Sequence, residues 1–272
     1  MPTTFYPGES RWRALWAAAG DALMGGITPL FPTTRQDNPA FPLSVPQARS
    51  ILATLRQQPV ALTRPVLVLN GYRGPDFQAV VLKEQLRQVT DADPSRWLAV
   101  SYATARTPEA MVSKVLGCVT ARSWKSAELD VVSISMGGVV AKLAALDGRG
   151  LRIRRLFTLA SPITGSRLAD RIAPDPAARA LRTGGAFLRE LDAAWQQHAA
   201  ARGIECVAYT RLDDLWVGAT RAHPPGQWPI WIEGRGIISH ATISRDPRIL
   251  ADLALRLRGQ EPIARPSPPP RD

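Results

Sequence analysis

A serine at the end of an expected strand carries the strongest chemical signal in the sequence. The run LDVVSI at 129–134 is typical of a buried parallel strand, and Ser135 follows it directly. Small and apolar residues at 136–146 then favour a helix, so the chain must bend sharply at the serine. Such a bend sets the hydroxyl at a helix N-terminus, where developing negative charge is favoured. Ser135 is therefore a candidate nucleophile for acyl transfer, although a serine here can also simply cap the helix.

The residues around Ser135 are small, as a strained turn of this kind requires. The segment reads Ser-Ile-Ser-Met-Gly-Gly, so Ser133 stands where the nucleophile-elbow pattern G-x-S-x-G has its first glycine. Gly137 fills the second glycine position, and Gly138 lets the helix pack closely on the strand. The bare pattern S-x-S-x-G is weak, and its position between this strand and this helix is what favours a nucleophile.

An earlier strand ends in a motif that can supply an oxyanion hole. The run VLVLNGYRGP at 66–75 reads as a buried strand followed by a glycine turn. The oxyanion of a tetrahedral intermediate needs two fixed donors, and one is the N–H of the residue after the nucleophile, here Met136. Gly71 would let the backbone turn so that the Tyr72 N–H supplies the other. A plain glycine turn between strand and helix explains the same residues equally well.

A serine hydroxyl needs a base, and the base needs an orienting carboxylate. The chain has only three histidines, and His240, in a loop entering the last expected helix, is in the position for a base. His198 reads as a helix surface residue, and His223 lies in an irregular loop. For the carboxylate, we prefer Asp214 in RLDDLWVGA, with Asp213 as the alternative acid.

Strands alternate with helices along the middle of the chain, which predicts an α/β fold with a mainly parallel sheet and helices on both faces. Apolar runs predict strands at 65–70, 97–102, 129–134, 153–160, 204–210 and 229–233. Helices are expected at 47–57, 76–89, 136–146 and 246–257, with another opened by Thr107 and Pro108.

Three segments flank or interrupt this core. Residues 1–64 are expected to form an N-terminal extension packing on it, with a helix at 11–23. Residues 163–201 are too long for a simple connection, so they form either a small cap or lid over the site or a helix packed on the core. The proline-rich tail at 259–272 is expected to be disordered, which leaves 65–258 as the catalytic domain.

The composition is that of a globular protein with a strong basic bias. The formal net charge is +11, and lysine occurs only at positions 83, 114, 125 and 142, so nearly all basic residues are arginine. This charge could attract nucleic acid or anionic lipid, but no block of five like charges appears. We therefore interpret it as an arginine bias on solvated surfaces and expect no nucleic-acid partner.

The sequence contains few features that indicate a cofactor, a metal or a membrane. With three histidines and two cysteines, a zinc site of the usual kind is not expected, and no cofactor or metal is implied. No run of 18 apolar residues and no secretory signal is present, so the expected compartment is the cytoplasm. The amphipathic segment 12–24 leaves weak contact with a membrane surface open. Oligomeric state is not indicated.

With these residues in place, the chain resembles bacterial α/β-hydrolase lipases and esterases from about residue 65 to 258. The resemblance rests on the motifs NGYRG, SISMGG, TLASPITGS, RLDDLWVGA and ISHATI. Asn70 stands where such lipases usually have histidine, Ser133 where they have glycine or histidine, and Ile163 where a T-P-H-x-G stretch has histidine. None of these departures removes a group needed for catalysis.

The resemblance implies the α/β-hydrolase fold and hydrolysis of a small-molecule or lipid ester through a covalent acyl-enzyme. It assigns the nucleophile, the orienting acid, the base and the two oxyanion donors to Ser135, Asp214, His240, Tyr72 and Met136. Two alternatives stay open. One is an acyltransferase or amidase on the same fold, and the other is a non-catalytic anion-binding protein on a hydrolase scaffold. The acyl chain and the alcohol of the substrate are not specified.

Overall fold

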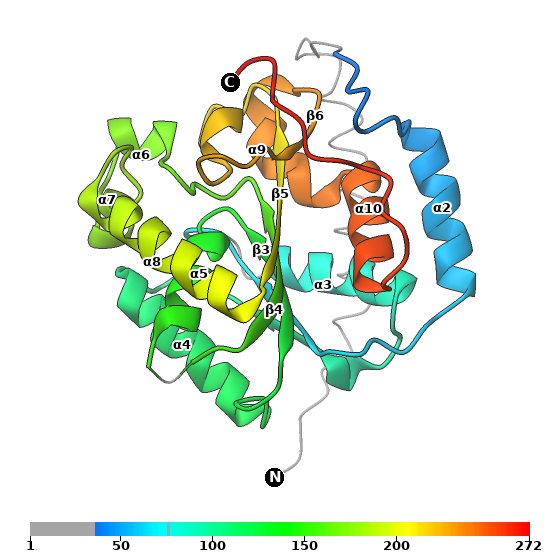
Figure 1. The fold of residues 1–272 in the computed structure, drawn as a ribbon, viewed down its shortest axis with the longest axis horizontal. Helices are drawn as coiled ribbons and strands as arrows, with labels where there is room; N and C mark the ends of the chain where they lie inside the picture. The colour runs from blue at the N-terminus through cyan, green and yellow to red at the C-terminus, as the bar shows by residue number, and fades with distance from the viewer. Residues whose placement is uncertain (1–35, 75–76, 149) are drawn as a thin grey trace.

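A parallel sheet forms the centre of the protein in the computed structural model, which describes residues 36–74, 77–148 and 150–272 (Figure 1). Its six strands run in the order β2-β1-β3-β4-β5-β6, and every neighbouring pair is parallel. The strands are β1 (Val66–Leu69), β2 (Trp97–Val100), β3 (Leu129–Ile134), β4 (Ile153–Leu159), β5 (Glu205–Arg211) and β6 (Ile230–Ile232). All six strands expected from the apolar runs are therefore confirmed, as is the α/β class.

Helices cover both faces of the sheet (Figure 1). They are α2 (Val45–Gln57), α3 (Phe77–Val89), α4 (Pro108–Ala121), α5 (Gly137–Leu146), α6 (Arg167–Arg171), α7 (Pro176–Ala180), α8 (Ala186–Arg202), α9 (Ser239–Thr242) and α10 (Pro247–Leu257). Successive side chains of β1 point into two hydrophobic cores, one on each face of the sheet. Leu67 and Leu69 pack with α4, α5 and α8, whereas Val66 and Val68 pack with α3 and α10. Burial on both faces explains why the strands read as continuous apolar runs.

The strand order determines where the chemistry lies. The chain leaves β1 toward β2 on one side and returns to β3 on the other, so the carboxyl ends of β1 and β3 are adjacent at a switch point of the sheet. Register pairs Leu69 with Ser133. The NGYRG loop that follows β1 and the serine turn that follows β3 therefore emerge side by side.

The described part of the N-terminal extension packs on the core through α2. Ser44 caps this helix, and the backbone amide of Ser44 in turn donates to the Gln47 side chain, which completes a capping box. α2 lies against α10 and α3. The helix expected at 11–23 and the amphipathic segment 12–24 lie outside the described residues.

The tail at 259–272 is ordered against the domain, so the expectation of disorder is wrong. Asp252 on α10 accepts hydrogen bonds from the backbone amides of Ile263 and Ala264, at 2.7 and 2.8 Å. Ala264 is buried, and the Asp272 carboxylate accepts from the Thr220 amide at 2.9 Å. The tail is ordered despite its prolines because oxygens of the domain accept from its few amide groups: the Asp252 carboxylate binds those of Ile263 and Ala264, and the Ala40 and Pro229 carbonyls bind those of Arg265 and Ser267.

The segment 163–201 contains two short helices and one long helix that packs on the core. α8 buries Leu188, Leu191 and Trp195 in the core beside α5, as expected of a helix packed on the domain. α6 and α7 are short, and the Leu168 and Ile172 side chains in this region are exposed.

None of the described helices is long and apolar enough to cross a membrane.

A buried ion-pair network fixes the start of α10, directly after the loop that carries His240. Arg211 and Asp246, both fully buried or nearly so, lie 2.6 Å apart, and Arg248 contacts the same carboxylate at 2.8 Å. Arg248 also pairs with Glu233. Burial alone would raise the pKa of Asp246, but the hydrogen bonds from Arg248 and the positive charges of both arginines outweigh it and hold that pKa well below its ordinary value.

Replacing Asp246 by asparagine is expected to lower the unfolding free energy at neutral pH by about 3–5 kcal/mol, because Arg211 stays buried without its counter-charge. A depressed native pKa contributes stability above the unfolded-state value, which is about 3.9 for aspartate, and that contribution is lost as pH falls below it. The gap between wild type and Asp246→Asn should therefore narrow in urea titrations from pH 7 toward pH 3. A gap that stays constant over this range would contradict the prediction.

Candidate active site

Ser135 sits on a strained turn between β3 and α5. Its backbone φ is +50°, in the left-handed region that non-glycine residues rarely adopt. The turn is held on both sides, because the Ser135 amide donates to the Leu159 carbonyl at 2.8 Å and the Gly138 amide donates to the Ser135 carbonyl at 3.1 Å. The hydroxyl is thereby presented at the carboxyl edge of the sheet.

The small residues around the turn are needed for packing. A Cβ at Gly137 would lie 2.8 Å from the Asn70 carbonyl oxygen, and one at Gly138 would lie 2.8 Å from the Ser161 Cβ. Both separations are shorter than real side chains tolerate. Ser133 is fully buried and its hydroxyl donates to the Phe157 carbonyl on β4. Two glycines and a serine thus let α5 approach both neighbouring strands.

The NGYRG loop passes directly beside Ser135. A Cβ at Gly71 would lie 3.2 Å from the Ser135 Cβ and 3.8 Å from its hydroxyl oxygen, so only a small residue leaves room for a substrate there. The Asn70 side chain accepts from the Gly71 amide at 2.9 Å and donates to the Gly74 carbonyl at 3.1 Å. Asn70 therefore organises the loop from the position where the resemblance expects histidine.

Two backbone amides at this point are free to bind an anion. Within the described part of the chain, the N–H groups of Tyr72 and Met136 donate no hydrogen bond to another residue. Tyr72 follows Gly71 and Met136 follows Ser135, so both amides belong to the two chain segments that meet at the hydroxyl. Unpaired N–H groups that flank a nucleophile are the donors that an oxyanion hole requires.

His240 and Asp214 form a buried hydrogen-bonded pair. The His240 Nδ1 lies 2.8 Å from the Asp214 Oδ2. The other carboxylate oxygen accepts from the backbone amides of Trp216 and Val217, at 2.9 and 3.0 Å. Asp214 is fully buried, and the Trp216 ring stacks on the imidazole with centroids 4.9 Å apart. A proton on Nδ1 that points at a carboxylate leaves Nε2 as the basic nitrogen.

The neighbouring Asp213 lies outside this pair. Its backbone has a φ of +57°, and its half-exposed carboxylate lies 3.1 Å from the Arg271 Nε. The other two histidines are also elsewhere. His198 stacks on Trp195 along α8, and the His223 Nδ1 lies 3.0 Å from the Pro224 carbonyl oxygen. Of the two aspartates left open by the sequence, the structure brings Asp214 to His240.

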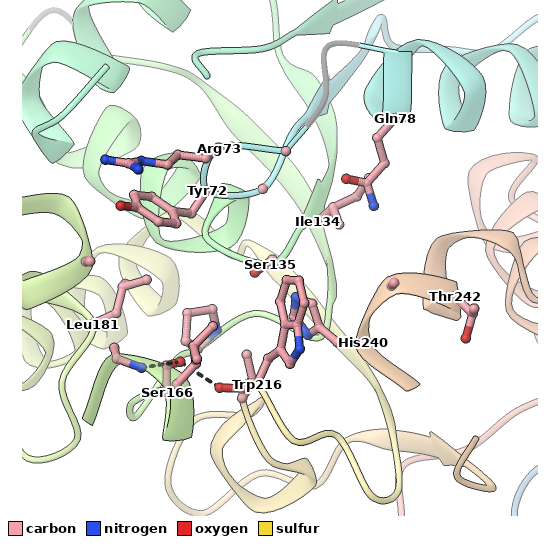
Figure 2. A pocket seen from close by; sticks show the side chains of 18 of the residues that line it. Tyr72, Arg73, Gln78, Ile134, Ser135, Ser166, Leu181, Trp216, His240 and Thr242 are labelled. Atoms are coloured by element: carbon pink, nitrogen blue, oxygen red, sulfur yellow. Dashed lines mark hydrogen bonds between the residues drawn. The ribbon is translucent and has the colours of Figure 1, made fainter. Parts of the chain in front are cut away.

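Ser135 and His240 open into the same cavity, which has a volume of about 560 Å³ (Figure 2). Tyr72 and Trp216 also line it. The remaining wall is mainly apolar and comes from β3, α3, the α6–α7 region and the loop around α9, including Phe77, Ile134, Leu168, Ile172, Leu181 and Ile238. The described residues contain no group of three or more His, Cys, Asp or Glu side chains placed to hold a metal ion.

Sequence reasoning missed three residues that shape the site. Trp216 orients His240 by stacking, and its only signal was its place two residues after Asp214. Asn70 was noted as a departure from a motif, not as the organiser of the loop. Asp175 was not considered, although its carboxylate accepts from the Tyr72 hydroxyl and the Arg73 guanidinium, both at 2.8 Å.

Asp175 links the NGYRG loop to α7. Its other oxygen accepts from the Ala178 amide at 2.9 Å and so caps that helix. Burial alone would raise the pKa of Asp175, but hydrogen bonds from Ala178, Tyr72 and Arg73 outweigh it and lower that pKa. One ionised carboxylate therefore holds the loop that carries the Tyr72 amide and the cap of a helix beside the cavity.

Removing the Tyr72 hydroxyl is expected to slow turnover without weakening substrate binding to the same degree. In Tyr72→Phe the loop loses a hydrogen bond of about 0.5–1.5 kcal/mol, so kcat should fall by about 2- to 10-fold while KM changes less. Tyr209→Phe is a matched control, because the Tyr209 hydroxyl donates to the buried Asp252 carboxylate at 2.7 Å, away from the cavity. Tyr209→Phe should lower the unfolding free energy and leave kcat unchanged. An equal fall of kcat in both variants would contradict a role of the Tyr72 hydroxyl in positioning the loop.

This sheet, with a serine on the turn after β3 and a histidine in the loop before the last helix, has the arrangement of the α/β-hydrolase fold. No protein-family model matches the chain, and no curated protein matches it by sequence.

Solved structures show the same fold. The mature form of a lipase from Bacillus licheniformis aligns with a TM-score of 0.55 at 13% identity, over 74% of this chain and 94% of that one. Its propeptide form aligns with a TM-score of 0.56 at 15% identity, over 78% of this chain and 54% of that one. A gene product of Listeria innocua aligns with a TM-score of 0.50 at 14% identity, over 73% and 95%. The chain therefore has the α/β-hydrolase fold.

Proposed function

We propose that the protein is a carboxylic ester hydrolase that works through a covalent acyl-enzyme on Ser135. The observation that carries this proposal is the buried His240–Asp214 pair at 2.8 Å, which opens into the same cavity as a serine held at positive φ. An imidazole that is oriented by a carboxylate, beside a hydroxyl on a strained turn, is the arrangement that activates serine for acyl transfer.

The proposed reaction has two halves. His240 Nε2 removes the Ser135 proton as the hydroxyl oxygen attacks the ester carbonyl, and Asp214 stabilises the imidazolium that forms. The amides of Tyr72 and Met136 bind the oxyanion of the tetrahedral intermediate. His240 then protonates the leaving alcohol, which departs and leaves the acyl group on Ser135. Water, deprotonated by His240, releases the acid in the same way.

The cavity favours an ester with a hydrocarbon chain. Leu168, Ile172 and Leu181, contributed by the region of α6 and α7, form an apolar wall large enough for an acyl group. The segment 163–201 would then act as a small cap through α6 and α7, while α8 anchors it to the core. Residues 65–258 would form the catalytic domain.

Two measurements test the proposal. Wild-type protein should be labelled by a fluorophosphonate probe and should hydrolyse p-nitrophenyl esters, with rates that depend on acyl-chain length. Absence of both would overturn the proposal and favour a non-catalytic binding protein. Product analysis in the presence of a competing alcohol or amine separates hydrolysis from acyl transfer, since both pass through the same acyl-enzyme.

A further inference from the structure

One cation on the cavity wall has no partner in the described part of the protein. Arg245 lines the cavity and is half-buried, and its side chain makes no hydrogen bond or ion pair to any described residue. It ends the short 3-10 helix Ile243–Arg245, which directly follows α9 and is therefore close to His240. A guanidinium that lines a mainly apolar cavity without a counter-charge is available to pair with an anionic group of a ligand.

Arg73, the other cation that lines the cavity, is already neutralised. It lies 2.8 Å from the Asp175 carboxylate, which Arg106 also approaches at 3.8 Å. These contacts hold it against α7, on the side of Ser135 where Leu181 lies (Figure 2). The two arginines are therefore not equivalent, and Arg245 is the one with its hydrogen-bond donors uncommitted.

The reaction chemistry indicates which part of an ester would meet Arg245, a step that rests on the proposed function. His240 must protonate the leaving oxygen, so the alcohol portion of the ester lies on the His240 side of Ser135. Thr242 and Gln78 line the cavity there, across Ser135 from Leu181 (Figure 2). The acyl chain would occupy the opposite, apolar side, beside Leu181 and Ile172.

We infer that Arg245 is a specificity-determining residue that binds an anionic group, a phosphate or a carboxylate, carried on the alcohol portion of the ester. A guanidinium binds either group through charge-assisted, often bidentate hydrogen bonds. The chain's net charge of +11 also favours the approach of anionic molecules to the protein. The substrate class is then an amphiphilic ester, with an apolar acyl chain and an anionic leaving alcohol.

The test compares matched octanoate esters of substituted phenols. The leaving group carries a carboxylate in 4-carboxyphenyl octanoate, a phosphate in the 4-phosphooxyphenyl ester, and no charge in the 4-carbamoylphenyl ester. In Arg245→Gln, the ratio of kcat/KM for an anionic ester to that for the neutral ester should fall on the order of tenfold from its wild-type value. The larger fall identifies phosphate or carboxylate as the preferred anion, and Arg245→Lys should restore part of the ratio.

Arg202→Gln provides the charge-matched control. Arg202 is exposed at the end of α8 and does not line the cavity, so this variant loses one positive charge yet should keep the wild-type ratio. A monophenyl ester of octanedioic acid, with its carboxylate on the acyl side, should gain nothing from Arg245. Turnover of the neutral ester with an unchanged ratio in Arg245→Gln overturns this inference alone. Absence of turnover for every ester overturns the proposed function and the inference with it.

Discussion

Replacing Ser135 by alanine is expected to lower kcat for a short p-nitrophenyl ester by about 10⁴-fold or more, because the substitution removes the oxygen that forms the acyl-enzyme. The fold should survive. Alanine and serine both carry a Cβ, so positive φ costs them a similar amount, and the turn is held by the amides of Ser135 and Gly138, which the substitution retains. The unfolding free energy should therefore change by about 1 kcal/mol or less. Single-turnover kinetics, fluorophosphonate labelling and urea unfolding measure these quantities.

Ser166 offers a matched control for this experiment. Its hydroxyl also lines the cavity, but it donates to the Trp216 carbonyl at 2.7 Å and caps α6, so it is already committed (Figure 2). Ser166→Ala should still be labelled by the probe, whereas Ser135→Ala should not. Labelling that survives in Ser135→Ala, or is lost only in Ser166→Ala, would place the nucleophile elsewhere in the cavity.

Much of the fold was predictable because the sheet is buried on both faces. Each strand reads as a short apolar run, and the caps at Thr107 and Asp246 mark the helices that follow. The strand order was not predictable from such local signals. It depends on how strands far apart in the sequence pair, and it is this order that brings the NGYRG loop to the serine turn.

The residue types of the candidate site could be predicted from the sequence, but the contacts that position those residues could not. Ser135, His240 and the aspartate pair could be predicted because the chain has few histidines and a clear serine turn between a strand and a helix. The contacts that support them are long-range: Asp175 joins Tyr72 across 103 residues, and Trp216 meets His240 only after the chain has passed through β6. No spacing rule within one element could have indicated either.

The ambiguity between Asp213 and Asp214 and the error about the tail have a common cause. Arg271 pairs with Asp213, and it belongs to the proline-rich segment for which the sequence predicts disorder. With the tail ordered, Asp213 has a partner at the surface and Asp214 is left to the imidazole. The surface position of Asp213 therefore includes a contact with a segment that the sequence does not suggest as a partner.

Asp214→Asn is expected to lower kcat by about 10⁴-fold while leaving the fold intact, because it places the proton on the wrong imidazole nitrogen. The backbone amides of Trp216 and Val217 both donate to the Asp214 Oδ1, so the asparagine carbonyl must take that place. Its NH₂ group then faces the His240 Nδ1 and can only donate to it. The imidazole responds by carrying its proton on Nε2, which can no longer accept the Ser135 proton.

The adjacent Asp213 provides a matched control for this prediction. Asp213→Asn changes the same side chain one residue away, at a backbone φ of +57° that asparagine tolerates well. It disrupts a half-exposed ion pair with Arg271 outside the cavity, so kcat should stay within about twofold of wild type and the unfolding free energy within about 1 kcal/mol. The two variants have the same net charge, so a change in net charge cannot explain a difference between them. If kcat collapsed in Asp213→Asn and survived in Asp214→Asn, the orienting role would belong to the surface aspartate, and the buried pair could not be the catalytic one.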